Sequence, residues 1–150
     1  MTPAFSYASA QLEDLDELVA LRIEAMRESL ERIGRFDPAR ARERFVAGFE
    51  PGCTRFIVVR GERVGFVVVK DTETGVLLDH LYLRPSAQGV GLGGAVLRDV
   101  IEAAEQGGST LHVGALRGSS ANRFYRRYGF EAVSESDWDI YYRRISESAQ

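Results

Sequence analysis

The sequence predicts a mixed α/β (α+β) domain in which about four helices flank a central, mostly antiparallel twisted sheet. Three observations support this. Apolar residues recur at helical spacing in several segments, short runs rich in valine and leucine lie between them, and turn-length links join the central runs. The 150 residues are 45% hydrophobic and 27% charged, which is typical of one globular domain spanning residues 1–150.

The N-terminal third is expected to contain one strand and two helices. Residues 4–10 alternate weakly between apolar and polar and are a candidate first strand. Residues 12–31 should form a helix, because they carry an apolar stripe at helical spacing. The stripe consists of Leu15, Val19, Ile23, Met26 and Leu30. Asp37 followed by Pro38 predicts the start of a second helix, with aspartate as the cap and proline in the first turn.

Three strands are predicted in the middle of the chain. They cover residues 55–60, 63–70 and 76–84. The links between them contain only the turn residues Gly-Glu and Asp-Thr-Glu-Thr-Gly. Because links this short cannot cross over a sheet, we expect the three strands to form an antiparallel meander.

The last third should alternate helices and strands. After a glycine-rich segment, Val96, Leu97 and Val100 lie on one face of a helix, and Gly107 or Gly108 supplies its left-handed C-terminal cap. The remaining elements are a strand at 110–116, a short helix capped by Ser119 or Ser120, and a last strand at 137–144.

The glycine-rich segment Gln88–Gly94 (QGVGLGG) precedes the third helix directly. Successive amides in such a turn can cradle an anion, and the helix that follows adds its positive N-terminal end. Glycine allows a diphosphate to approach the main chain without obstruction from a Cβ atom. We expect the side chains of Val90 and Leu92 to turn into the core. A plain turn without a ligand is the alternative.

The same segment also contains G-x-G-x-x-G, the fingerprint of dinucleotide-binding domains. That fingerprint requires a glycine almost directly after a strand, and an acidic residue about 20 positions further on. Here Arg84–Gln88 intervene, and the strand at 110–116 contains no acid. The pattern therefore favours a different phosphate ligand over NAD and over a nucleotide-dependent oxidoreductase.

Two segments together resemble the GNAT N-acetyltransferase superfamily. Residues 81–97, LYLRPSAQGVGLGGAVL, are similar to motif A of that family, a strand and proline turn followed by Q/R-x-x-G-x-G/A at a helix start. Residues 121–130, ANRFYRRYGF, resemble its later helix, where F-Y follows an alanine and G-F leads into a strand. The resemblance implies a GNAT acyl-CoA N-acyltransferase fold over residues 1–150, with two parallel strands that splay apart around acetyl-CoA.

The resemblance also implies which residues bind acetyl-CoA. The pantetheine amides would meet main-chain groups of the first splayed strand, and the diphosphate would lie on the glycine-rich segment. The implied cofactor residues are Leu81, Tyr82, Leu83, Gln88, Gly89, Val90, Gly91, Leu92, Gly93 and Gly94, with Ser119, Asn122 and Tyr125 from the later helix. Many family members have an asparagine two or three residues before the helix alanine, where this chain has Gly118 and Ser119.

Acetyl transfer to an amine requires a base for the amine and an acid for the departing thiolate. Tyr125 matches the tyrosine of the family's F-Y pair and is the candidate acid, because a phenol keeps its proton at neutral pH. Asp79 and His80 are polar residues inside an apolar strand and are the candidate bases. Imidazole titrates nearest to neutrality, although a water relay or a structural role for either residue stays open.

Composition excludes several other classes of partner. A net charge of −3 without a basic patch argues against nucleic acid, and no apolar run approaches the roughly 18 residues of a membrane span. The scattered His80, His112 and Cys53 predict no metal site. A single cysteine and an N-terminus without an apolar leader indicate a cytoplasmic protein.

The expected partners are thus acetyl-CoA and an amine acceptor. The site that binds the acceptor should be formed by the first two helices, their link at 27–40, and the aromatic residues Trp138, Tyr141 and Tyr142. These three aromatic residues are equally candidates for the core or for a homodimer contact. A non-catalytic acyl-CoA-binding regulatory module is the alternative function.

Overall fold

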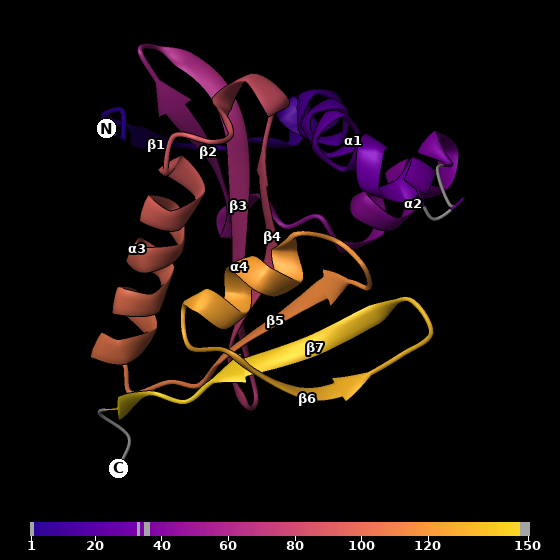
Figure 1. The fold of residues 1–150 in the computed structure, drawn as a ribbon. Coiled ribbons are helices and arrows are strands. Elements are labelled where there is room, and N and C mark those ends of the chain that lie inside the picture. Colours follow the sequence, from indigo (N-terminus) through magenta and orange to yellow (C-terminus); the bar gives the residue numbers. More distant parts are fainter. Residues whose placement is uncertain (1, 33, 35–36, 148–150) are drawn as a thin grey trace. The chain divides into compact units, whose positions relative to one another are not determined.

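The protein is described by a computed structural model that covers residues 2–32, 34 and 37–147. Seven strands form one sheet in the order β1-β2-β3-β4-β5-β7-β6 (Figure 1). The chain forms two compact units, one of Met1–Val68 with His80–Val96, the other of Val69–Asp79 with Leu97–Gln150. Three elements contribute to both units: β3 (Glu62–Thr72), β4 (Gly75–Leu83) and α3 (Leu92–Gln106).

The first unit begins with strand β1 (Ser6–Ser9), followed by helices α1 (Leu15–Arg32) and α2 (Pro38–Gly48) and strand β2 (Thr54–Val59). Strand β2 pairs antiparallel with β1 on one side and with β3 on the other. Apolar side chains from these elements form a continuous core. Its buried members are Ala10, Leu18, Val19, Leu21, Phe45, Phe56, Phe66 and Val68.

The capping of α2 is confirmed: Asp37 accepts a hydrogen bond from the Arg40 amide at 3.2 Å, and Pro38 is the first helical residue. The stripe predicted for α1 is partly wrong. The buried residues are Leu18, Val19 and Leu21, whereas Ile23 is only half-buried. The face of α1 that packs on the core therefore lies nearer to Leu18 than the predicted stripe does, because Leu18 and Leu21 fill the core together with Phe45 of α2.

The second unit contains strand β5 (Leu111–Leu116), helix α4 (Ala121–Arg127) and strands β6 (Glu131–Glu135) and β7 (Asp139–Arg144). Figure 1 shows β5, β7 and β6 side by side, and both contacts of β7 are antiparallel. The β4–β5 ladder is parallel and contains three residue pairs, from Val76↔Leu111 to Leu78↔Val113. The prediction of a mostly antiparallel sheet with one parallel pair is therefore confirmed.

The end of α3 follows the glycine cap that the sequence predicts, and Gly108 is the left-handed residue, with φ of +64°. The Gly108 amide donates to the Glu105 carbonyl at 3.0 Å and the Ser109 amide to the Ala104 carbonyl at 2.9 Å. These two bonds define a Schellman motif. The predicted cap of α4 is wrong in part, since Ser120 occupies the N-cap position but makes no side-chain capping bond.

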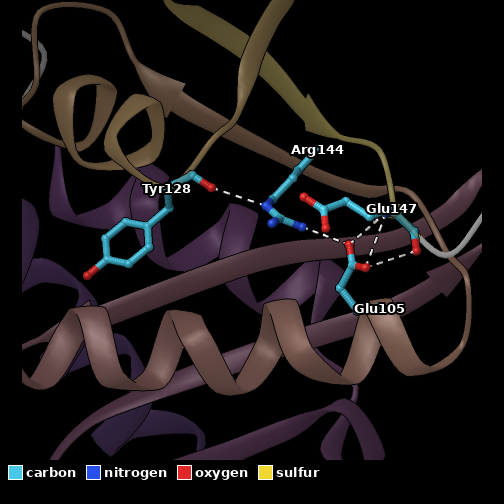
Figure 2. Close-up of polar contacts among 5 residues, drawn as sticks. Glu105, Tyr128, Arg144 and Glu147 are labelled. Carbon is cyan, nitrogen blue, oxygen red and sulfur yellow. Dashed lines mark hydrogen bonds and ion pairs between the residues drawn. The ribbon is translucent and has the colours of Figure 1, made fainter.

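A polar cluster ties the end of β7 to α3 within the second unit (Figure 2). Glu105 accepts from Arg144 Nη1 at 2.8 Å, from the Ser146 hydroxyl at 3.3 Å and from the Glu147 amide at 3.2 Å. Arg144 Nε also donates to the Tyr128 carbonyl at 3.1 Å. Burial alone would raise the pKa of Glu105, but the Glu147 amide and the Arg144 and Ser146 side chains together lower that pKa below its ordinary 4.5.

We expect Glu105→Gln to lower the melting temperature by a few degrees at pH 7 and to have little effect at pH 3. A carboxyl group with a lowered pKa in the folded state stabilises it above the ordinary pKa, and this contribution disappears as pH falls through the lowered value. Thermal unfolding at both pH values tests this. Glu102→Gln, on the exposed face of α3, is the control; an equal loss at the two pH values would contradict the role of charge.

Candidate active site

The glycine-rich segment forms a turn between a 3₁₀ helix at Pro85–Ala87 and the start of α3. Gly89 and Gly91 both have φ of +81°, a conformation that side chains other than glycine's rarely adopt. Leu92 is 1% exposed and anchors the turn in the core, as predicted. The same prediction is wrong for Val90, whose side chain is 44% exposed. With positive φ on both sides, Val90 lies at the tip of the turn.

Main-chain amides of this segment, from Gly89 onward, have no acceptor among the described residues. In the described part of the chain, none of the consecutive N–H groups from Gly89 to Gly94 donates to a protein acceptor. The first bond of the helix is made by the Ala95 amide, which donates to the Gly91 carbonyl at 3.1 Å. Unpartnered amides at a helix start are an anion site in which the donors and the helix dipole act together.

The side chain of Gln88 fastens the turn to the end of β4. Its Nε2 atom donates to the Leu83 carbonyl at 2.8 Å, and the Arg84 amide donates to the Val64 carbonyl of β3 at 2.8 Å. Gln88 therefore holds the segment in place through its side chain. The Leu83 carbonyl has this protein partner, which makes Leu81 and Tyr82 the better candidates for main-chain contacts with a ligand.

The two candidate bases on β4 have different surroundings. Asp79 Oδ2 is 3.2 Å from Lys70 Nζ, and this ion pair supports a structural role for the aspartate. His80 packs among aromatic rings, with ring centroids 5.2 Å from Phe45 and 5.5 Å from Tyr82. Its Nδ1 atom lies 3.3 Å from the Tyr82 hydroxyl. The histidine thus has one ring nitrogen oriented by a neighbour, as a base requires.

Tyr125 of α4 is 6% exposed and contacts aromatic side chains of the second unit. Its ring lies 5.5 Å from that of Phe130 and 6.3 Å from that of Tyr142. Tyr142 is 1% exposed and belongs to the core, as the sequence suggested, whereas Trp138 and Tyr141 are 46% and 41% exposed.

The polar atoms of Asn122 are engaged inside the protein. Its Nδ2 donates to the carbonyls of Leu116 at 2.9 Å and Ser119 at 3.0 Å, and its Oδ1 accepts from the Tyr142 hydroxyl at 2.7 Å. These bonds fasten the turn between β5 and α4. They give Asn122 a structural role and leave Ser119 as the better candidate of the two for a cofactor contact.

Two residues that lie beside β4, Gly65 and Arg22, were not identified from the sequence. Gly65 of β3 lies so close to β4 that an added Cβ would overlap the Tyr82 carbonyl oxygen. Arg22 of α1 places its guanidinium carbon 6.0 Å from the centre of the Tyr82 ring. A signal for Arg22 was present, because position 22 follows Leu15 and Leu18 by seven and four residues and so lies on the buried side of the helix.

Residues 2–32, 34 and 37–147 contain neither a membrane-spanning helix nor a cluster of metal ligands. No helix in these ranges is both long and apolar enough to cross a membrane. In the same ranges, His, Cys, Asp and Glu side chains form no group of three or more that could hold a metal ion.

Known proteins share this fold. A family model described as an acetyltransferase (GNAT) domain matches residues 52–132. No curated protein sequence is a significant match. Among solved structures, the PaiA N-acetyltransferase from Thermoplasma acidophilum in complex with coenzyme A is 15% identical with a TM-score of 0.76, covering 95% of this chain and 99% of that one.

Two further structures have the same fold. An acetyltransferase from Thermus thermophilus is 18% identical with a TM-score of 0.74, over 96% of this chain and 98% of that one. The ribosomal-protein-S18-alanine N-acetyltransferase from Escherichia coli is 20% identical with a TM-score of 0.68, over 95% of each chain. Since the family model covers more than half of the sequence, the chain belongs to the GNAT acetyltransferases, acyltransferases that use acetyl-CoA.

Proposed function

We propose that residues 1–150 are a single N-acetyltransferase domain that moves the acetyl group of acetyl-CoA to a primary amine by direct attack in a ternary complex. The amine belongs to a small molecule or to an exposed amino group of a protein or peptide. The observation that carries this proposal is the row of unpartnered amides from Gly89 to Gly94 at the start of α3. An amide row of this kind matches a diphosphate, which acetyl-CoA contains.

The residues of the first unit suit the binding of acetyl-CoA. The segment Gln88–Gly94 would hold the diphosphate, and main-chain groups of Leu81, Tyr82 and Leu83 would hold the pantetheine arm. Gln88 acts through the bond that fixes the turn, and Ser119 of the second unit is proposed as a further contact. When bound, acetyl-CoA supplies an acetyl thioester that is activated toward nucleophiles.

The chain must then move two protons. The amine nitrogen forms a bond to the acetyl carbon while the carbon–sulfur bond breaks, so the amine loses a proton and the thiolate gains one. We assign the first proton to His80, whose ring is oriented by Tyr82, in preference to Asp79, which is paired with Lys70. We assign the second to the phenol of Tyr125.

Turnover with a panel of amines tests the function. We expect thiol release from acetyl-CoA that depends on an amine, together with a higher melting temperature in acetyl-CoA but not in NAD, because only a bound ligand stabilises the fold. Stabilisation by acetyl-CoA without turnover on any amine would instead favour the non-catalytic regulatory module. Stabilisation by NAD alone would favour an oxidoreductase.

Gly91→Ala should raise the Kd for acetyl-CoA about tenfold. Alanine at φ of +81° costs about 1–2 kcal/mol, and relief of that strain turns the neighbouring amides away from the diphosphate. Calorimetric titration measures the effect. Gly61→Ala is the control for backbone strain, because Gly61 has φ of +76° but lies in the β2–β3 turn. It has open space around it, whereas an added Cβ at Gly91 also meets the Thr2 hydroxyl at the end of a side chain. Equal affinity in the two variants would refute the cradle.

Two further properties are proposed. A reducing, cytoplasmic compartment suits the one cysteine, Cys53, whose thiol donates to Glu50 at 3.4 Å. A homodimer would use the exposed edge strand β6 and the neighbouring Tyr141. Sedimentation of the purified chain decides the oligomeric state.

A further inference from the structure

Arg22 of α1 is an arginine without an acidic partner in a partly buried position. Its Nη1 atom donates to the Ala41 carbonyl of α2 at 3.1 Å. Its Nε atom is buried and has no hydrogen-bond partner among the described residues. Leaving a buried charged donor unpaired is costly, so such a group requires an explanation.

Five acidic residues on and just before α1 pair with arginines other than Arg22, whereas Glu13 and Glu24 have no ion pair among the described residues. Arg63 binds Asp14 and Glu17, Arg42 binds Asp16, Arg27 binds Glu31, and Arg32 binds Glu28. Arg22 has no ion pair with any described residue. Carboxylates are therefore present along α1, and none of the described ones pairs with Arg22.

The free part of the guanidinium has a defined shape. With Nη1 bonded to Ala41, the edge formed by Nε and Nη2 keeps two parallel N–H donors. This edge fits a carboxylate, which accepts two parallel hydrogen bonds from arginine. The aromatic rings of Phe66 and His80 lie beside Tyr82, with ring centroids 5.5 Å from that of Tyr82 in each case.

The position of Arg22 connects it to the proposed reaction. Its guanidinium carbon is 6.0 Å from the centre of the Tyr82 ring, and the hydroxyl of that same tyrosine is 3.3 Å from His80. Arg22 and the proposed base thus share one neighbour within the first unit.

We propose that the Nε–Nη2 edge of Arg22 binds a carboxylate of the acceptor, so that the preferred substrates are amines that also carry a carboxylate. This inference rests on the proposed N-acetyltransferase function and adds the substrate class. The carboxylate belongs either to a free amino acid or to the acidic residue of a peptide acceptor. Arg22 acts as a specificity residue and takes no part in proton transfer.

Matched amine pairs test this proposal. In each of three pairs, the two amines differ only by a carboxylate: lysine and cadaverine, ornithine and putrescine, and phenylalanine and phenethylamine. For peptide acceptors, the matched pair is a peptide with glutamate and one with glutamine near the N-terminus. In the wild type we expect kcat/KM to be at least about tenfold higher for the carboxylate member of a pair or for the glutamate peptide. The arm with the larger preference identifies the source of the carboxylate.

Arg22→Gln should raise the acceptor KM for carboxylate amines by about tenfold or more, and leave the KM for acetyl-CoA and for uncharged partners within about twofold. Arg22→Lys should restore part of the preference, since it keeps the charge and loses the two-pronged edge. Arg44→Gln, an exposed arginine of α2, is the control. Equal preference in the wild type and in Arg22→Gln would overturn the proposal, as would a wild-type preference for uncharged amines.

Binding of N-acetylated amino acids and of their methyl amides, measured by calorimetry, gives a readout independent of turnover. We expect the wild type to bind the acids more tightly than the amides, and Arg22→Gln and Arg22→Lys to lose or reduce that difference. If no amine is acetylated but this difference is present, the proposed function fails while the carboxylate site stands. If amines are acetylated and neither assay shows a carboxylate preference, the site fails alone.

Discussion

Replacing Gly65 with alanine will lower the melting temperature by roughly 6–12 °C and weaken acetyl-CoA binding. An alanine Cβ at this position overlaps the backbone oxygen of Tyr82 and lies 3.0 Å from Leu83 Cα. Neither atom is at the end of a flexible side chain, so the β4 backbone itself must move. Overpacking of this kind costs about 3 kcal/mol, and each kcal/mol corresponds to about 2–4 °C in a chain of this size.

The consequence for binding follows from which atoms move. Tyr82 and Leu83 carry the main-chain groups proposed to hold the pantetheine arm, and the Leu83 carbonyl accepts from Gln88. Gly65 also pairs with Ile57 next to an irregularity in the β2–β3 register. Thermal unfolding and calorimetric titration of Gly65→Ala measure both effects.

Gly114→Ala is the control for this experiment. Gly114 also lies in a strand, but an added Cβ there meets only the Tyr141 side chain at 3.3 Å, and that ring is exposed and can shift. We expect a change of less than about 2 °C. If the two variants melt at the same temperature, the close approach of β3 and β4 at Gly65 is not required for the fold.

Most of the fold was predictable because its signals are local. The Asp37–Pro38 helix start, the glycine that ends α3 and the short links of the β2–β3–β4 meander each depend on a few adjacent residues. The orientation of α1 was less predictable. Its exact buried face depends on Phe45, which comes from a later helix.

The candidate site divides in the same way. The Gln88–Gly94 turn was predictable, since its conformation is set by glycines within the segment itself. The bonds of Asn122 to Leu116 and Tyr142 and the ion pair of Asp79 with Lys70 were not predictable, because each partner lies on a different element. The solvent exposure of Val90 has a local cause, since the glycines on both sides of it have positive φ. Arg22 was missed although its position falls on the buried side of α1, because a charged residue on a helix is ordinarily assigned to the exposed face.

We expect Tyr125→Phe to reduce kcat on the order of 10²-fold or more while the Kd for acetyl-CoA stays within about twofold. The substitution removes one oxygen and keeps the ring, so contacts with Phe130 and Tyr142 are preserved. Without a proton donor, the reaction must expel a thiolate, which slows breakage of the carbon–sulfur bond. Steady-state kinetics and calorimetric titration measure the two quantities separately.

Tyr128→Phe provides the comparison. Tyr128 follows directly after α4 and its hydroxyl accepts from Arg98 at 3.4 Å, so this variant also removes a phenol hydroxyl from the same part of the second unit. It should retain turnover close to that of the wild type. A structural role for Tyr125 makes a different prediction: acetyl-CoA affinity, melting temperature and kcat would fall together. Because an acid that donates to sulfur lowers kcat alone, the pattern across the three measurements separates chemistry from packing at this buried tyrosine.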